Sequence, residues 1–138
     1  MRSLAQIERC LAQLLEKGPQ AGDAGTVLDL AEEVLEHWIS ARGGWPTGGR
    51  REGFRLLALH HQGARGEPSF NACRESCREL VYHYNLLTLE PGDARGGARA
   101  LMMARLANHL YLFVAGKLQM ERLGEFCCAS RPLRTAAE

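Results

Sequence analysis

The sequence predicts an all-α fold, which we expect to be a four-helix-bundle-like single domain with one additional short helix. Two observations support this fold class. Apolar residues recur three and four positions apart over most of the chain, which is the period of an amphipathic helix. Segments rich in glycine and proline separate these stretches, and none of the stretches alternates as a strand would. At 138 residues, the chain is long enough to bury one hydrophobic core.

The first two helices are predicted over residues 3–17 and 26–42. Ser3 is suited to cap the first helix, because its hydroxyl oxygen can accept a hydrogen bond from a free backbone N–H group of the first turn. Gly18, which a proline follows, ends this helix. Thr26 is the predicted cap of the second helix, since an acidic residue follows it three positions later.

Three further helices follow, and glycine or proline separates them. The last of them is the longest, and it is apolar over most of its circumference. We expect one helical domain over residues 1–126 and a flexible C-terminal tail over residues 127–138, which contain Pro132. The three predicted helices span residues 51–63, 69–90 and 98–123.

A helix that is apolar nearly all round lies at the centre of a bundle or in an interface. The charge distribution also favours an interface, because residues 1–36 carry three basic and seven acidic side chains, whereas residues 37–137 carry fourteen and eight. We therefore expect a small cytoplasmic adaptor or regulatory protein that contacts another protein, or a second copy of itself as a homodimer. The predicted partner-binding residues are Met102, Met103, Leu106, Leu110 and Phe113.

The five cysteines indicate free thiols rather than a disulfide framework. Their number is odd and no signal-peptide pattern precedes them, so we expect a cytoplasmic location. Cys73 and Cys77 lie four residues apart in the middle of an apolar helix stripe. Because a free cysteine behaves as a small apolar residue, we interpret this pair as part of the core rather than half of a metal or redox site.

A metal- or haem-binding helical bundle is the first alternative. Two helices carry the pattern Glu-x3-His, in EVLEHW and ELVYHY, which places a carboxylate and an imidazole on one helix face. Dimetal carboxylate bundles use Glu-x2-His instead. The spacing therefore favours solvated Glu–His pairs, and we expect no cofactor. The candidate ligands are Glu33, His37, Glu79 and His83, together with Cys73 and Cys77.

Weak nucleic-acid binding is the second alternative, and it depends on the glycine-rich loop RGGWPTGGRREGFR. Arginines with aromatic rings nearby suit the phosphates and unstacked bases of a single strand. The formal net charge of the chain is only +1, which argues against a nucleic-acid partner. The residues concerned are Arg42, Trp45, Arg50, Arg51 and Arg55.

No pattern in the sequence indicates an enzyme or a membrane span. The loop GGWPTGGR lacks the lysine of a phosphate-binding loop, and no Gly-x-Ser-x-Gly elbow is present, so we predict no catalytic residue. Polar residues interrupt the most apolar run. Of the adjacent His60 and His61, at most one can face the core, because neighbours on a helix point about 100° apart. Bulky apolar residues follow His109, so we expect it to be buried.

Overall fold

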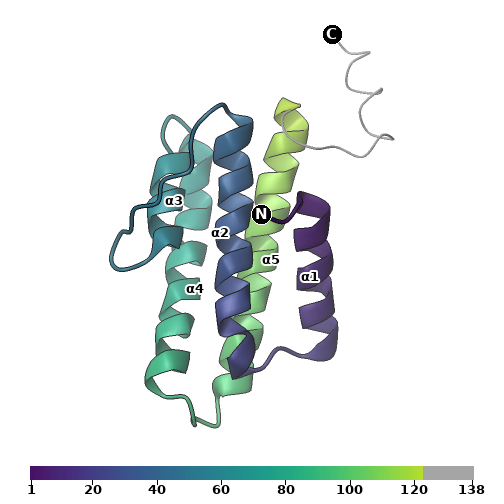
Figure 1. Cartoon of the computed structure of the whole chain (residues 1–138), viewed down its shortest axis with the longest axis vertical. Helices are drawn as coiled ribbons and strands as arrows, with labels where there is room; N and C mark the ends of the chain where they lie inside the picture. The colour runs from purple at the N-terminus through teal and green to yellow at the C-terminus, as the bar shows by residue number, and fades with distance from the viewer. Residues whose placement is uncertain (123–138) are drawn as a thin grey trace.

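The computed structural model describes residues 1–122, and Figure 1 shows their arrangement. These residues form five α-helices and two short 3-10 turns, with no β-strand among them, so the all-α prediction is confirmed. The predicted tail, residues 127–138, lies outside the described residues. The elements are α1 (Leu4–Lys17), η1 (Ala21–Asp23), α2 (Ala24–Ala41), α3 (Arg55–Gly63), η2 (Pro68–Phe70), α4 (Asn71–Leu89) and α5 (Gly96–Glu121).

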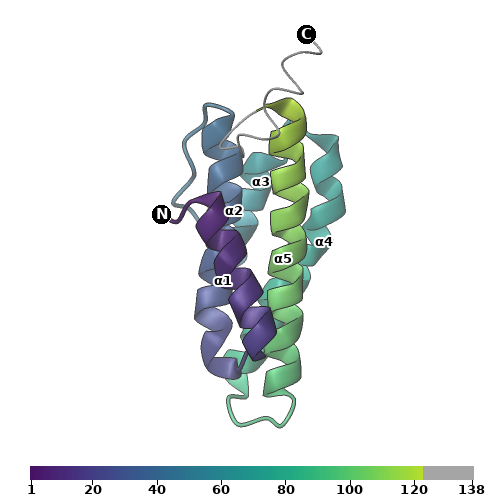
Figure 2. The same cartoon turned by 90° about the vertical axis from the view of Figure 1, so that its right-hand side faces the viewer.

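The helices pack as a bundle, and α5 lies against most of the other helices. Helix α5 contacts α1, α2 and α4, while α3 packs against α2 and α4. Figure 1 shows the short α3 beside the upper part of α2, and Figure 2 shows α5 in front, between α1 and α4. No helix among the described residues combines the length and apolar character that crossing a membrane requires.

The start of α1 is as predicted. The Ser3 hydroxyl accepts a hydrogen bond from the Gln6 backbone N–H at 3.2 Å, and the Gln6 side chain accepts one from the Ser3 N–H at 2.8 Å. This reciprocal capping box satisfies two backbone donors that the helix itself cannot use. At the other end, Gly18 adopts a positive φ of 85° and caps the helix, as expected.

Helix α2 begins at Ala24, so the prediction that Thr26 caps it is wrong. The Asp23 carboxylate accepts a hydrogen bond from the Gln20 backbone N–H at 2.8 Å and closes the 3-10 turn η1. This turn leads directly into the α-helix. The backbone around Thr26 is therefore already helical, and Thr26 is an exposed residue of the first turn.

Aromatic rings from three elements pack together in the core. Trp38 of α2 and Phe70 of η2 are fully buried, with ring centroids 4.8 Å apart. Phe113 of α5 meets Phe70 edge to face at 5.3 Å. The Trp38 indole N–H donates a 3.0 Å hydrogen bond to the Gly63 carbonyl, which satisfies the single polar atom of this side chain and fixes the end of α3 against α2.

The cysteine pair of α4 belongs to this core, as predicted. Cys73 and Cys77 are each 1% exposed and face the apolar interior. Burial raises the pKa of both thiols, that of Cys73 to about 11, so neither forms a thiolate near neutral pH. The pair therefore acts as two small apolar groups in the seam between α4 and its neighbours.

Candidate functional site

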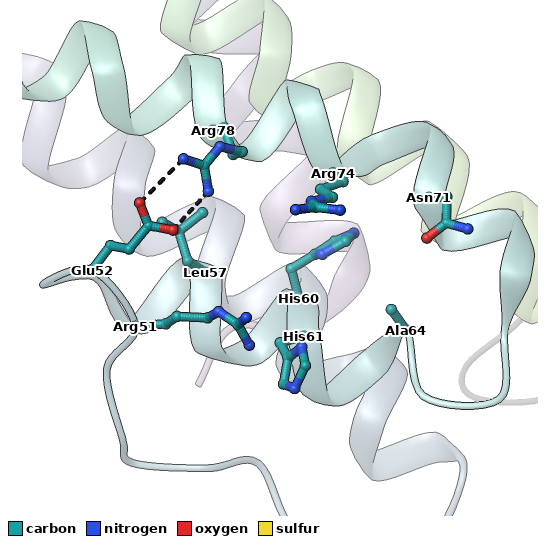
Figure 3. A pocket seen from close by; sticks show the side chains of 9 residues that line it. All are labelled: Arg51, Glu52, Leu57, His60, His61, Ala64, Asn71, Arg74 and Arg78. Carbon is teal, nitrogen blue, oxygen red and sulfur yellow. Dashed lines mark hydrogen bonds and ion pairs between the residues drawn. The ribbon is translucent and has the colours of Figure 1, made fainter.

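A hollow lined by charged side chains lies where the 42–54 loop, α3 and α4 meet. Its volume is about 250 Å³. Figure 3 shows the side chains of three arginines pointing into it together with two histidines of α3. We call this hollow the arginine pocket, and its polar lining is Arg51, Glu52, His60, His61, Arg74 and Arg78.

A tight turn places Arg51 and Glu52 at the pocket. The backbone N–H groups of Arg51 and Phe54 each donate to the carbonyl of the other residue at 3.0 Å. Glu52 and Gly53 between them have φ values of 54° and 85°, the pair of left-handed conformations of a type I′ turn. Glycine adopts this conformation freely, whereas for Glu52 it is unfavourable and must be held by surrounding contacts. The turn also delays the short helix, which begins at Arg55 and not at residue 51 as predicted.

The rest of the 42–54 loop is fastened to α3 by one amide side chain. The Gln62 side chain donates to the Trp45 carbonyl at 2.7 Å and accepts from the Thr47 N–H at 2.8 Å. The Arg55 Nε donates to the Thr47 carbonyl at 2.9 Å. Residues 45–50 make no backbone–backbone hydrogen bond to the described residues, so these three bonds hold that part of the loop against α3.

Helices α3 and α4 supply the remaining walls. Arg74 and Arg78 are four residues apart and follow the buried cysteines by one position each, so both side chains lie on the adjacent exposed face of α4. Two like charges at this spacing repel each other. His61 is exposed and His60 is 6% exposed, which confirms that only one of the two faces the core.

His60 links the pocket to the core. Its Nε2 donates to the Phe70 carbonyl at 2.9 Å, and its ring lies 5.9 Å from the Phe70 ring. Burial lowers the pKa of His60; the hydrogen bond to Phe70 opposes this shift, and the positive charge of Arg74 adds to it. His60 is therefore neutral at pH 7, and positive charge in the pocket comes from the arginines.

An adjoining hollow of about 440 Å³ continues the basic surface. It shares Arg51 and His61 with the arginine pocket, so the two hollows are contiguous. Together they are lined by five arginines and one acidic residue, Glu52. Four of these arginines form no ion pair with any described residue: Arg50, Arg51, Arg65 and Arg74.

The structure divides the arginines that the sequence singled out for nucleic acid. Arg42 pairs with Glu67 and stacks over the Trp38 ring at 4.9 Å. Arg55 pairs with Glu32 and Glu36. Both arginines are therefore occupied by neighbouring carboxylates or by the core.

The other two predicted arginines, Arg50 and Arg51, line the two hollows, and Trp45 of the same loop is 88% exposed. Sequence reasoning missed the residues of α3 and α4 that complete the site. The Arg-x3-Arg spacing on α4 was the available signal. The missed residues are His60, His61, Arg65, Arg74 and Arg78.

The candidate metal ligands do not come together. No group of three or more histidine, cysteine or acidic side chains capable of holding a metal occurs within residues 1–122. On α2, Glu33 accepts from the Arg2 backbone N–H at 2.8 Å and pairs with its guanidinium, while His37 contacts the Arg2 carbonyl at 2.6 Å. On α4, Glu79 and His83 form a surface pair at 3.5 Å. Each Glu-x3-His pattern thus has a local structural role.

Helix α5 buries part of its predicted partner-binding face. Met103 and Leu110 are at most 1% exposed and belong to the core, so they are unavailable to a partner in this fold. Leu106 and Phe113 are half-buried against the core, and Met102 is 37% exposed.

Other residues of α5 are the more open ones. Leu112 and Met120 are 58% and 74% exposed, although neither was among the predicted contacts. His109 is exposed and not buried as predicted.

Comparison with known proteins adds no identification. The chain matches no family model, and neither curated proteins nor solved structures match it significantly. The class that the fold and the site define is an all-α bundle with a basic pocket between its shortest helix and α4.

Proposed function

We propose that this protein is a binding module that holds a phosphate-bearing ligand in the arginine pocket. The observation that supports this function is the convergence of Arg51 and Arg74, neither of which forms an ion pair with any residue of 1–122, on one hollow with Arg78. The positive charges of Arg51 and Arg74 have no carboxylate partner among residues 1–122, and an anion bound between them would compensate both charges.

The chemistry of the guanidinium group favours a phosphate. Arginine presents a planar fork of donors that matches the oxygens of a phosphate or carboxylate in pairs. Glu52 already occupies the fork of Arg78, at 2.7 and 3.1 Å, which indicates the kind of oxyanion that this surface accepts. Arg51 and Arg74 retain free donors, and a group with three terminal oxygens can use more than one fork at once.

Calorimetric titration with inorganic tripolyphosphate tests the proposal. In the double variant Arg51→Gln/Arg74→Gln, the affinity should fall at least about tenfold, since a charge-assisted hydrogen bond contributes about 1.5–3 kcal/mol. Arg9→Gln/Arg105→Gln is the matched control, because these two exposed arginines of α1 and α5 form no ion pair within the described part of the chain and lie outside both hollows. Equal affinity in the two double variants would refute a specific site.

Protein–protein contact through the outer face of α5 is a second candidate function, for a partner protein or a second copy of the chain. It is favoured by the exposure of Met102, Leu112 and Met120 on one helix. Leu112→Glu should abolish self-association, measured as solution mass by light scattering, without unfolding this exposed site. A monomeric wild-type protein up to high concentration would refute the homodimer. The cytoplasm, where the thiols remain reduced, is the location that both candidates assume.

A further inference from the structure

We infer that the ligand of the basic surface is a single-stranded nucleic acid, whose phosphates lie along the two hollows and whose base stacks on Trp45. This inference rests on the proposed function, because it requires the arginine pocket to bind phosphate. It extends that site along both hollows and adds the Trp45 ring as a surface on which a base stacks.

The first argument is the elongated shape of the basic surface. The arginine pocket and the adjoining hollow share Arg51 and His61, so the two hollows meet at these side chains and form one longer basic surface. Arg74 and Arg78 of α4 line one end, and Arg50 and Arg65 line the other. A single small phosphate would fill only one hollow, whereas a chain of phosphates can contact both.

The second argument is the position of Trp45. Its backbone carbonyl is bound by Gln62, which also lines the adjoining hollow, so Trp45 lies at the end of this basic surface. Its side chain is 88% exposed, although an indole is among the largest apolar groups of the chain. The hydrogen bonds from the Thr47 N–H and to the Thr47 carbonyl hold the loop in place, so the ring is presented on a fixed support.

An exposed ring on the loop that leads to Arg50 and Arg51 suits an unpaired base. Bases in a single strand can leave their stack and lie on an aromatic side chain, whereas bases in a duplex are already stacked on each other. A phosphorylated peptide would use the same arginines but has no base to place on Trp45. The ring therefore favours a single strand over both a duplex and a phosphopeptide.

Fluorescence anisotropy with a labelled single strand of about 12 uridylates tests the inference, with tripolyphosphate as the second probe. Trp45→Ala should weaken the single strand about tenfold and leave tripolyphosphate binding unchanged, because it removes one stacking contact. Arg74→Gln should weaken both probes. The logarithm of the affinity should fall against the logarithm of salt concentration with a slope of about −3 if four phosphates are neutralised.

Tyr82→Ala is the matched aromatic control. Tyr82 is 58% exposed on α4 and lines neither of the two hollows. It should not alter the affinity of either probe. Circular dichroism of both alanine variants checks that their helix content is unchanged.

The outcomes separate this inference from the proposed function. If tripolyphosphate binds through Arg74 but Trp45→Ala leaves the single strand unaffected, the nucleic-acid inference is wrong and the anion site stands. If a duplex or a phosphorylated acidic peptide binds as tightly as the single strand, the inference is also wrong. If neither probe binds, both the proposed function and the inference fail.

Discussion

Glu52 accepts two hydrogen bonds from the guanidinium group of Arg78, although its own backbone is held in the left-handed conformation. These hydrogen bonds lower the pKa of the Glu52 carboxyl, so it is ionised at neutral pH. A charged side chain in an unfavourable backbone conformation thus occupies one of the three arginines of the pocket. Glu52 stands where an anionic ligand would otherwise bind Arg78.

Glu52→Gln should therefore tighten the binding of tripolyphosphate. Removing the carboxylate frees the Arg78 fork and deletes the acidic residue of the two hollows. We expect an increase of roughly two- to fivefold, the range that corresponds to one surface ion pair. Glu16 is an exposed residue of α1 that pairs with no cation among the described residues, so Glu16→Gln removes the same charge elsewhere and should have no effect. Weaker binding by Glu52→Gln in calorimetry would mean that Glu52 orients Arg78 for the ligand rather than competing with it.

The stability of the protein should depend on pH through His60. Burial lowers the pKa of this side chain below its ordinary value of 6.5. Between the lowered pKa and 6.5 the unfolded chain binds more protons than the folded chain, so the free energy of unfolding falls as the pH falls below about 6.5. The expected slope is at most about 1.4 kcal/mol per pH unit.

Urea denaturation at several pH values measures this dependence. His60→Gln should flatten the slope between about pH 6.5 and pH 5, since the amide does not titrate and can still donate to the Phe70 carbonyl. His61→Gln changes the exposed neighbour and should leave the slope as it is in the wild type. The same slope in all three proteins would show that His60 does not govern the acid sensitivity.

Features that depend on a few neighbouring residues were predictable from the sequence. The Ser3 capping box needs only four consecutive residues, and the burial of Cys73 and Cys77 follows from the helical period. The division of roles between His60 and His61 follows from the same period. In each case the local pattern and the tertiary packing agree.

The arginine pocket was not predictable in the same way. Its residues come from a loop and two helices, and their proximity depends on the turn at Glu52 and on the Gln62 bonds that fasten the loop to α3.

The α5 face was hard to predict for a related reason. Met102 and Met103 are adjacent and equally apolar, so only the positions of α1, α2 and α4 around α5 decide that the first is exposed and the second is in the core.

The two buried cysteines should respond differently to serine. The Cys73 thiol donates to the Phe70 carbonyl at 3.3 Å, and a serine hydroxyl can make the same bond. Cys77 is equally buried but makes no hydrogen bond within the described residues, so a hydroxyl there is left unsatisfied. Cys77→Ser should lower the free energy of unfolding by about 1–3 kcal/mol, and Cys73→Ser by less.

Guanidinium denaturation of the two variants measures this difference, and Cys10→Ser at a half-buried site of α1 is the control with little expected change. A larger loss at Cys73 than at Cys77 would contradict the assignment of the hydrogen bond. Equal stability of all three variants and the wild type would contradict the burial of the cysteine seam.

Two glycine-to-alanine substitutions should shift stability in opposite directions. Alanine is favoured over glycine inside a helix by about 1 kcal/mol, provided that the new methyl group has room. At Gly116 of α5 a Cβ atom would meet no atom within 4 Å, so Gly116→Ala should raise the free energy of unfolding by about 0.5–1 kcal/mol. At Gly63 it would lie 3.0 Å from Cδ1 of Trp38.

The Trp38 ring cannot move away from Gly63 easily, because it packs on Phe70 and its indole N–H donates to the Gly63 carbonyl. Gly63→Ala should therefore lower the free energy of unfolding by about 1–2 kcal/mol, despite the better helix propensity of alanine. Chemical denaturation of the two variants side by side provides the test. A stabilised Gly63→Ala variant would mean that α3 shifts freely against α2, and that the support of the arginine pocket is less rigid than these contacts indicate.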